Sequence, residues 1–222
     1  MKECTKYVGL DVHKATIAVA IAEAGSSEVR YFGEISNTPE QITKTLRKLG
    51  GSGTELSICY EAGPCGYEVY RQLSKLGIDC MVVAPSMIPR KPGDRVKTDR
   101  RDSQMLARLH RAGELTSVWV PSAEQEALRD LVRGRADFVL LQTQARQRLN
   151  AFLLRHGKRF DGKSKWTQAH FRWLETIKCG FPVQQIVLQE YIDTVLQMQK
   201  RIKALDKQIE LAGNESTLWR RP

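Results

Sequence analysis

The amino-acid sequence predicts an α/β domain followed by a long helical region, and three observations support this. Short β-rich apolar runs bounded by turn residues occupy the chain up to Pro85. The later runs alternate with helical patterns, as is typical of α/β folds. From Ser122 onward helical patterns dominate, and there is no proline between Pro121 and Pro182. We therefore expect one domain over residues 1–121 and a basic, coiled-coil-like helical region over residues 122–222.

The first region is expected to begin with three strands and to continue with alternating helices and strands. The first two strands are separated only by His13-Lys14, which predicts a hairpin. Pro39 in the first turn and Gly50-Gly51 at the end bound the first helix. This element order is that of a ribonuclease-H-like fold, in which the first strand lies at the centre of the sheet. Strands are predicted over residues 6–12, 15–22, 28–35, 55–60 and 78–83, and helices over residues 39–49, 65–76 and 99–112.

The helical region ends in a heptad pattern, which is typical of helices that pair lengthwise. Within the region, Gly134 and Gly157 are expected to interrupt the helices, and residues 161–164 are expected to form a turn. The pattern supports either an antiparallel hairpin with residues 123–156 or an intermolecular coiled coil, so we expect a homo-oligomer without fixing its form. The apolar heptad residues are Leu188, Val195, Ile202 and Ile209 at one position and Tyr191, Met198, Leu205 and Ala212 at the other.

The charge of the chain is unevenly distributed. Residues 1–89 carry 9 Lys+Arg against 10 Asp+Glu, whereas residues 90–222 carry 26 against 15. A strongly basic second part indicates a polyanion partner, most simply nucleic acid. Ribosomal or nonspecific polyanion binding would produce the same asymmetry, so the charge identifies a class of partner and nothing finer.

Other features of the composition exclude several classes of protein. With 41% hydrophobic and 27% charged residues, the chain is expected to fold and to be soluble. It has no run of 18 apolar residues and no signal peptide, so we expect a cytoplasmic protein without a membrane span. Its five cysteines include no C-x-x-C pair, so neither a zinc site nor a disulfide framework is indicated.

Four carboxylates occur where acidic residues are unexpected. Asp11 and Glu61 end apolar strand-like runs, and Asp99 and Asp102 share one face of a helix. Singly, each has an ordinary role: a turn for Asp11, a helix cap for Glu61, and neutralisation of nearby arginines for the other two. Together they predict a site for Mg²⁺, with Mn²⁺ as a substitute, that performs two-metal phosphodiester chemistry. The predicted catalytic and metal-binding residues are Asp11, Glu61, Asp99 and Asp102.

Two basic stretches are candidates for contacts with nucleic-acid phosphates. The first flanks the third and fourth carboxylates, although Pro89, Pro92 and Gly93 also fit a mobile surface loop there. The second follows in the helical region and is suited to an RNA or DNA backbone. The candidate residues are Arg90, Lys91, Arg95, Lys97, Arg100 and Arg101 in the first stretch, and Arg146, Arg148, Arg155, Lys158 and Arg159 in the second.

Several ordered blocks of the sequence resemble those of a known protein family. Together the blocks cover roughly residues 6–157, and their order and spacing make the resemblance specific. The heptad region adds weaker support. The blocks are Tyr7-Val8-Gly9-Leu10-Asp11-Val12-His13-Lys14, Tyr60-Glu61-Ala62-Gly63 with Gly66-Tyr67, Val83-Ala84-Pro85-Ser86, Lys97-Thr98-Asp99-Arg100-Arg101-Asp102, Ala107-Arg108-Leu109, Gln147-Arg148-Leu149-Asn150 and Leu153-Leu154-Arg155-His156-Gly157. With these blocks the chain resembles the DEDD transposases of bacterial insertion sequences, in the insertion-sequence-110 family.

The resemblance implies a resolvase-like ribonuclease-H domain whose four carboxylates bind Mg²⁺, in a protein that recombines DNA at insertion-sequence ends. It also implies assembly into oligomers and, for some members, guidance by a structured RNA from the element itself. Complete members continue into a second domain with a serine thought to attack DNA. No serine in residues 1–222 matches it, so we expect a truncated transposase.

Three other functions compete with this prediction. A sugar-kinase-like or actin-like ATPase would need small residues just after Asp11, so that the backbone can approach the phosphates. The bulky Val12-His13-Lys14 stands there instead, and no glycine-rich phosphate loop occurs, so the sequence argues against ATP hydrolysis. A stand-alone Holliday-junction resolvase would use the same four carboxylates. A fragment that only binds nucleic acid and oligomerises would show salt-dependent binding without metal-dependent chemistry.

Overall fold

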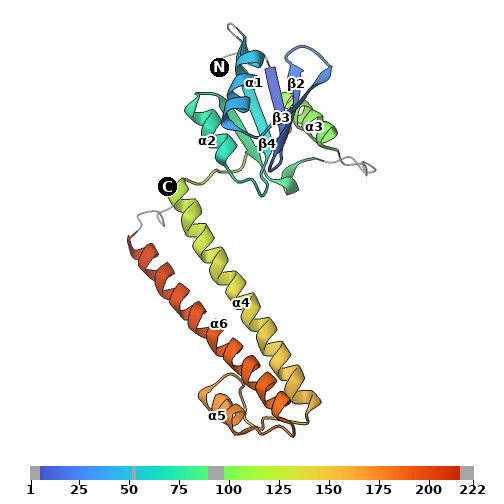
Figure 1. Ribbon diagram of the computed structural model, residues 1–222. Coiled ribbons are helices and arrows are strands. Elements are labelled where there is room, and N and C mark those ends of the chain that lie inside the picture. Colours follow the sequence, from blue (N-terminus) through green and yellow to red (C-terminus); the bar gives the residue numbers. More distant parts are fainter. Residues whose placement is uncertain (1–5, 52–53, 90–97, 216–222) are drawn as a thin grey trace. The chain divides into compact units, whose positions relative to one another are not determined.

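The computed structural model describes residues 6–51, 54–89 and 98–215 (Figure 1). The chain forms two compact units that divide between Val120 and Pro121. In the described residues, every strand belongs to the first unit, and the second unit contains helices and their connections.

The first unit is built on a single five-stranded sheet with the order β3-β2-β1-β4-β5. β1, β2 and β3 pair as an antiparallel meander, whereas β4 runs parallel to β1 and β5 runs parallel to β4. This confirms the predicted ribonuclease-H-like fold, with the first strand at the centre. The strands are β1 (Lys6–Val12), β2 (Thr16–Glu23), β3 (Val29–Ser36), β4 (Leu56–Glu61) and β5 (Asp79–Val83).

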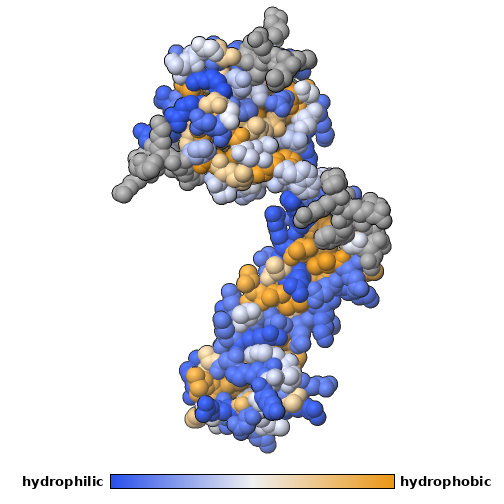
Figure 2. Space-filling view, turned by 180° about the vertical axis from the view of Figure 1, so that it is seen from behind, coloured by the Kyte–Doolittle hydropathy of each residue, from blue (hydrophilic) through white to orange (hydrophobic). Residues whose placement is uncertain are grey.

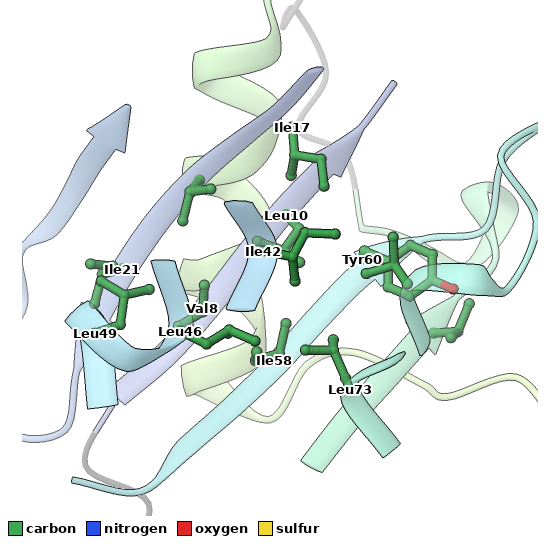
Figure 3. Packing of buried hydrophobic residues seen from close by; sticks show 13 residues of the cluster. Val8, Leu10, Ile17, Ile21, Ile42, Leu46, Leu49, Ile58, Tyr60 and Leu73 are labelled. Atoms are coloured by element: carbon green, nitrogen blue, oxygen red, sulfur yellow. The ribbon is translucent and has the colours of Figure 1, made fainter. Parts of the chain in front are cut away.

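Helices cover both faces of this sheet. On one face, α1 (Pro39–Gly50) and α2 (Glu68–Lys75) bury a hydrophobic core that includes Leu10 and Tyr60 (Figure 3). On the other face, Leu106 and Leu109 of α3 (Asp99–Ala112) pack against Cys59 of β4. Because side chains alternate between the faces of a strand, the residues next to Leu10 and Tyr60 point toward α3.

The second unit is an antiparallel helical hairpin with a short helix beside it. α4 (Ala123–Arg155) packs along α6 (Pro182–Glu215), and α5 (Gln168–Thr176) lies where α4 ends and α6 begins (Figure 1). Leu188 and Val195 of the heptad pattern are fully buried against α4, so the pattern serves pairing within the chain. Arg135 of α4 donates a 2.8 Å hydrogen bond to Asp206 of α6. None of the described helices is long and apolar enough to cross a membrane.

Two local predictions were wrong, and one helix was not predicted. α2 begins at Glu68 rather than at residue 65, because Gly66 has a left-handed φ of 65° and closes a turn with Gly63. Gly134 does not interrupt α4, which continues to Arg155. α5 was not predicted as a separate helix; it follows Trp166, whose positive φ of 66° breaks the helical path, and begins with a Thr167 cap.

Candidate active site

Asp11 and Glu61 lie at the same end of two adjacent parallel strands. Leu10 is paired with Tyr60 across β1 and β4, so the next residues, Asp11 and Glu61, occupy equivalent positions. Both therefore point away from the core that holds Leu10 and Tyr60, toward the face that α3 covers. The side chain of Asp11 is only 17% exposed, while Glu61 is half-buried.

The first turn of α3 contributes the other two carboxylates. Thr98 caps the helix, and its hydroxyl accepts a hydrogen bond from the backbone N–H of Arg101. This cap fixes the start of the helix, so that Asp99 and Asp102 stand on one face of its first turn. Both residues were predicted to begin this helix, and the structure places them there.

His13 joins the carboxylates and is missing from the predicted site residues. Its Nε2 lies 3.2 Å from Asp11 Oδ2 and 3.5 Å from Asp99 Oδ1. The turn that holds His13 is closed by its N–H to the carbonyl of Thr16 and by the Asn37 side-chain amide, which donates to the carbonyl of His13. The available sequence signal was its position two residues after a strand-end aspartate, in the hairpin turn.

Burial and like charges make the carboxylate of Asp11 unusually costly to ionise. Burial is the main cause that raises the pKa of Asp11, and the charges of Asp102 and Asp99 raise it further. His13 opposes this shift through its charge and its hydrogen bond. The carboxylate of Asp102 is therefore near enough to Asp11 to act on it electrostatically.

The arrangement fits a hard divalent cation, which prefers carboxylate oxygens. In the described part of the chain, the side chains whose ligand atoms lie within 4.8 Å of one another are Asp11, His13 and Asp99. Glu61 and Asp102 stand outside this tight group, on the neighbouring strand end and the same helical turn. A cation among these groups would relieve the repulsion that raises the pKa of Asp11.

The predicted basic residues are distributed over both units. Arg100 and Arg101 are exposed in the first turn of α3, and the guanidinium of Arg100 lies 5.3 Å from the ring centre of Tyr31. On α4, Arg148 and Arg155 are exposed, whereas Arg146 is half-buried with its guanidinium 5.0 Å from the ring centre of Trp166. Arg90, Lys91, Arg95 and Lys97 lie outside the described residues.

Two solved structures of Thermus thermophilus RuvC are similar to the chain, one of them in complex with a Holliday junction substrate. Their TM-scores are 0.35 and 0.34, with sequence identities of 10% and 11%. Each match covers 51% of this chain and 99% of the RuvC chain.

Closer relatives are found by sequence. The chain is 50% identical over 191 residues to "Putative transposase y4qE" of Sinorhizobium fredii, a match that covers 86% of this chain and 49% of that protein. It is 39% identical over 212 residues to the transposase for insertion sequence element IS1533 of Leptospira borgpetersenii, covering 94% of this chain and 61% of that protein. The chain thus spans between about half and three-fifths of the length of these relatives.

The family itself is shown by a match to a family model. Residues 8–157 fit the model of a family described as transposase, the DEDD transposases of the insertion-sequence-110 type. This range includes Asp11, Glu61, Asp99 and Asp102, and it extends through α4 to Gly157. The chain belongs to the insertion-sequence-110 family of DEDD transposases.

Proposed function

We propose that this chain carries the metal-dependent centre of a DNA transposase, with Asp11, Glu61, Asp99 and Asp102 as the ligands of Mg²⁺. The observation that supports this most is the meeting of Asp11 and Asp99, which are far apart in the sequence, at one end of the central strand. A cluster of carboxylates beside exposed arginines suits chemistry on a phosphodiester. Membership of a transposase family agrees with this reaction class.

In this proposal, each element supplies one part of the site. Asp11 from β1 and Asp99 from α3 would hold the cation, and Glu61 and Asp102 would supply further ligands. When bound there, Mg²⁺ would stabilise negative charge on the scissile phosphate and would activate a water or hydroxyl nucleophile. Arg100 and Arg101 neutralise phosphates beside the carboxylates, which contributes affinity rather than sequence choice.

His13 acts on the ligands rather than on the substrate. Its contacts with Asp11 and Asp99 hold two carboxylates from different elements beside each other. Its charge favours the ionised form of Asp11, which is the form that binds a cation. We therefore assign His13 as a positioning residue of the site.

The second unit is proposed to bind nucleic acid and a second copy of the chain. Arg148 and Arg155 are exposed on α4, where they can contact phosphates of DNA or of an element-encoded guide RNA. Large apolar side chains are also exposed along these helices, as the orange surface in Figure 2 shows. They include Leu140 and Leu154 on α4 and Val183 and Ile186 on α6, at 62%, 72%, 68% and 62% exposure. Such a surface suits a homo-oligomer.

Calorimetric titration of the purified chain with Mn²⁺ tests the metal site. We expect binding that Asp11→Asn and Glu61→Gln both abolish, because each removes a charged ligand. The exposed residue Glu114, which ends no strand of the sheet, supplies a matched control as Glu114→Gln. A folded chain that binds no Mn²⁺, or variants that bind it as well as the unchanged chain, would refute the assignment.

A nucleic-acid-binding role without catalysis is the second candidate, and the exposed arginines of α4 favour it. Salt-dependent binding of DNA or RNA together with no metal-dependent cleavage or joining would support this candidate. Cleavage of branched DNA without any RNA would instead indicate a junction-resolving nuclease.

A further inference from the structure

A hollow of about 410 Å³ lies in the second unit, where the end of α4, the connection after it and α5 meet. Figure 1 shows α5 beside this end of the helix pair. The volume falls in the range of roughly 300–1,000 Å³ that is typical of sites for small ligands. The hollow belongs to a different unit from Asp11 and Asp99, and the proposed metal chemistry does not use it.

Aromatic rings form one side of this hollow. The ring centres of Phe160 and Trp173 are 5.3 Å apart, and both side chains are half-buried. His170 lies beside them, stacked on Trp173 at 5.5 Å and edge-on to Phe160 at 4.8 Å. The planes of Phe160 and Trp173 are inclined by 50° to each other, so these rings form an aromatic wall on which another flat ring can stack against one of them.

His170 is completely buried, yet one of its two nitrogens has no partner. Its Nδ1 accepts a hydrogen bond of 3.2 Å from the backbone N–H of Trp166, a residue in the left-handed conformation. Burial, with a contribution from Lys165, lowers the pKa of His170, so the ring is neutral and its proton is on Nε2. Nε2 has no hydrogen-bond partner among the described residues. A buried donor without an acceptor is costly, and a ligand with an acceptor atom would satisfy it.

Cationic side chains surround the same hollow. Lys158, Arg159 and Lys165 line it and are exposed, and the ammonium group of Lys165 donates to the side chain of Asn150 at 3.2 Å. Among the residues that the structure describes, no acidic side chain lines the hollow. A ligand that fits these features carries negative charge next to a flat ring with hydrogen-bond acceptors.

We propose that this hollow binds one unpaired nucleotide of a single nucleic-acid strand, with the base against Phe160 and Trp173 and the phosphate near Lys158, Arg159 and Lys165. His170 donates from Nε2 to an acceptor on the nucleotide. A base in a duplex is stacked on both faces and cannot enter, so the site selects single-stranded segments. The inference rests on the proposed nucleic-acid binding of the second unit and specifies where and how a base is recognised.

Fluorescence anisotropy of the full chain at one fixed salt concentration tests this site. The probes are three labelled strands of equal length: oligouridine RNA, oligothymidine DNA and an abasic DNA strand that has phosphates but no bases. We expect the base-bearing strands to bind roughly tenfold more tightly than the abasic strand, the effect of stacking about one base. The tighter of the two base-bearing strands shows whether RNA or DNA is the natural source of the nucleotide.

Two kinds of variant separate the base contact from the phosphate contact. Phe160→Leu and His170→Gln should remove the preference for base-bearing strands and leave affinity for the abasic strand unchanged. Phe181→Leu is the matched control, because Phe181 is 65% exposed and does not line the hollow. Lys158→Gln with Arg159→Gln should weaken the binding of all three strands. The loss of affinity should be larger than for Lys163→Gln with Arg172→Gln, which makes the same change of charge outside the hollow.

The outcomes distinguish this inference from the proposed function. Equal affinity of the unchanged chain for abasic and base-bearing strands would overturn the nucleotide site and leave nucleic-acid binding intact. Absence of binding to every strand would overturn both, while the Mn²⁺ titration would still decide the carboxylate site. Circular dichroism verifies that each variant is folded, and if His170→Gln unfolds, Phe160→Leu alone decides the outcome.

Discussion

Gly9 of β1 lies directly against the backbone of Ser103 in α3. A Cβ atom at Gly9 would overlap the carbonyl oxygen of Ser103 and the amide nitrogen of Ala107, and would lie 3.0 Å from Cβ of Leu106. The helix approaches the strand this closely only because Gly9 has no side chain. Since Gly9 is two residues before Asp11, this contact controls how near the first turn of α3 comes to that carboxylate.

Substitution of Gly9 by alanine should therefore affect both the fold and the metal site. We expect Gly9→Ala to lower the free energy of unfolding by about 3 kcal/mol, because the overlap is with backbone that cannot move aside cheaply. Urea unfolding followed by circular dichroism measures the change, and Mn²⁺ affinity should fall as well. Gly180→Ala is the control, since a Cβ there meets nothing within 4 Å. Equal stability of Gly9→Ala and the unchanged chain would contradict the close approach.

Gly134 should respond in the opposite direction. It lies inside α4, and a Cβ at this position would meet nothing within 4 Å. Alanine loses less backbone entropy than glycine in a helix, so Gly134→Ala should raise the free energy of unfolding by about 0.5–1 kcal/mol. A higher urea midpoint with an unchanged slope would verify this, whereas a lower midpoint would mean that the helix needs glycine for another reason.

Removal of the two carboxylates of α3 should separate metal binding from nucleic-acid binding. Asp99→Asn with Asp102→Asn deletes two negative charges beside Arg100 and Arg101, so nucleic-acid affinity should stay equal or rise while Mn²⁺ binding is lost. Calorimetry and anisotropy measure the two effects on the same protein. Asp161→Asn with Glu114→Gln removes the same charge elsewhere and should retain Mn²⁺ binding. Weaker nucleic-acid binding in the folded α3 variant would argue against the site.

Hydrogen bonds made by the buried side chains of Ser57 and His110 connect α3 to the end of β4 opposite Glu61. Ser57 Oγ donates to Asp79 Oδ2 at 2.6 Å and accepts from Nε2 of His110 at 2.8 Å. Burial lowers the pKa of His110 below 6.5, and the charge of Asp79 opposes this only in part. His110 is therefore neutral in the folded chain at pH values where the unfolded chain already takes up a proton.

The lowered pKa of His110 should consequently make stability depend on pH. At this residue the unfolded chain binds more protons than the folded chain below about pH 6.5, so its contribution to the free energy of unfolding should fall as the pH drops through that value. Burial also lowers the pKa of His170, which adds an effect of the same sign. Urea unfolding at a series of pH values measures the slope, and His110→Gln should reduce it without abolishing it. An unchanged slope in His110→Gln would exclude this histidine as a cause.

Much of the fold was predictable because its signals are local. The apolar runs that became β1, β4 and β5 are continuous in sequence, and the strand-end positions of Asp11 and Glu61 follow from where those runs stop. The N-terminus of α3 was readable from Thr98 followed by acidic residues in the first turn. α5 was not predicted because its start depends on Trp166, which has a positive φ. No sequence pattern around a tryptophan indicates this conformation.

The sequence by itself determined the α/β class, the order of the elements and the residue types available for the site, because propensity and apolar periodicity act over a few neighbouring residues. Only the tertiary structure decided which of these residues meet. The contact of His13 with Asp11 and Asp99 depends on a hairpin turn and on a helix brought close by Gly9. The heptads of α6 likewise did not specify a partner, and the structure pairs them with α4 of the same chain. These contacts join segments far apart in the sequence, and their geometry depends on how closely backbones can pack.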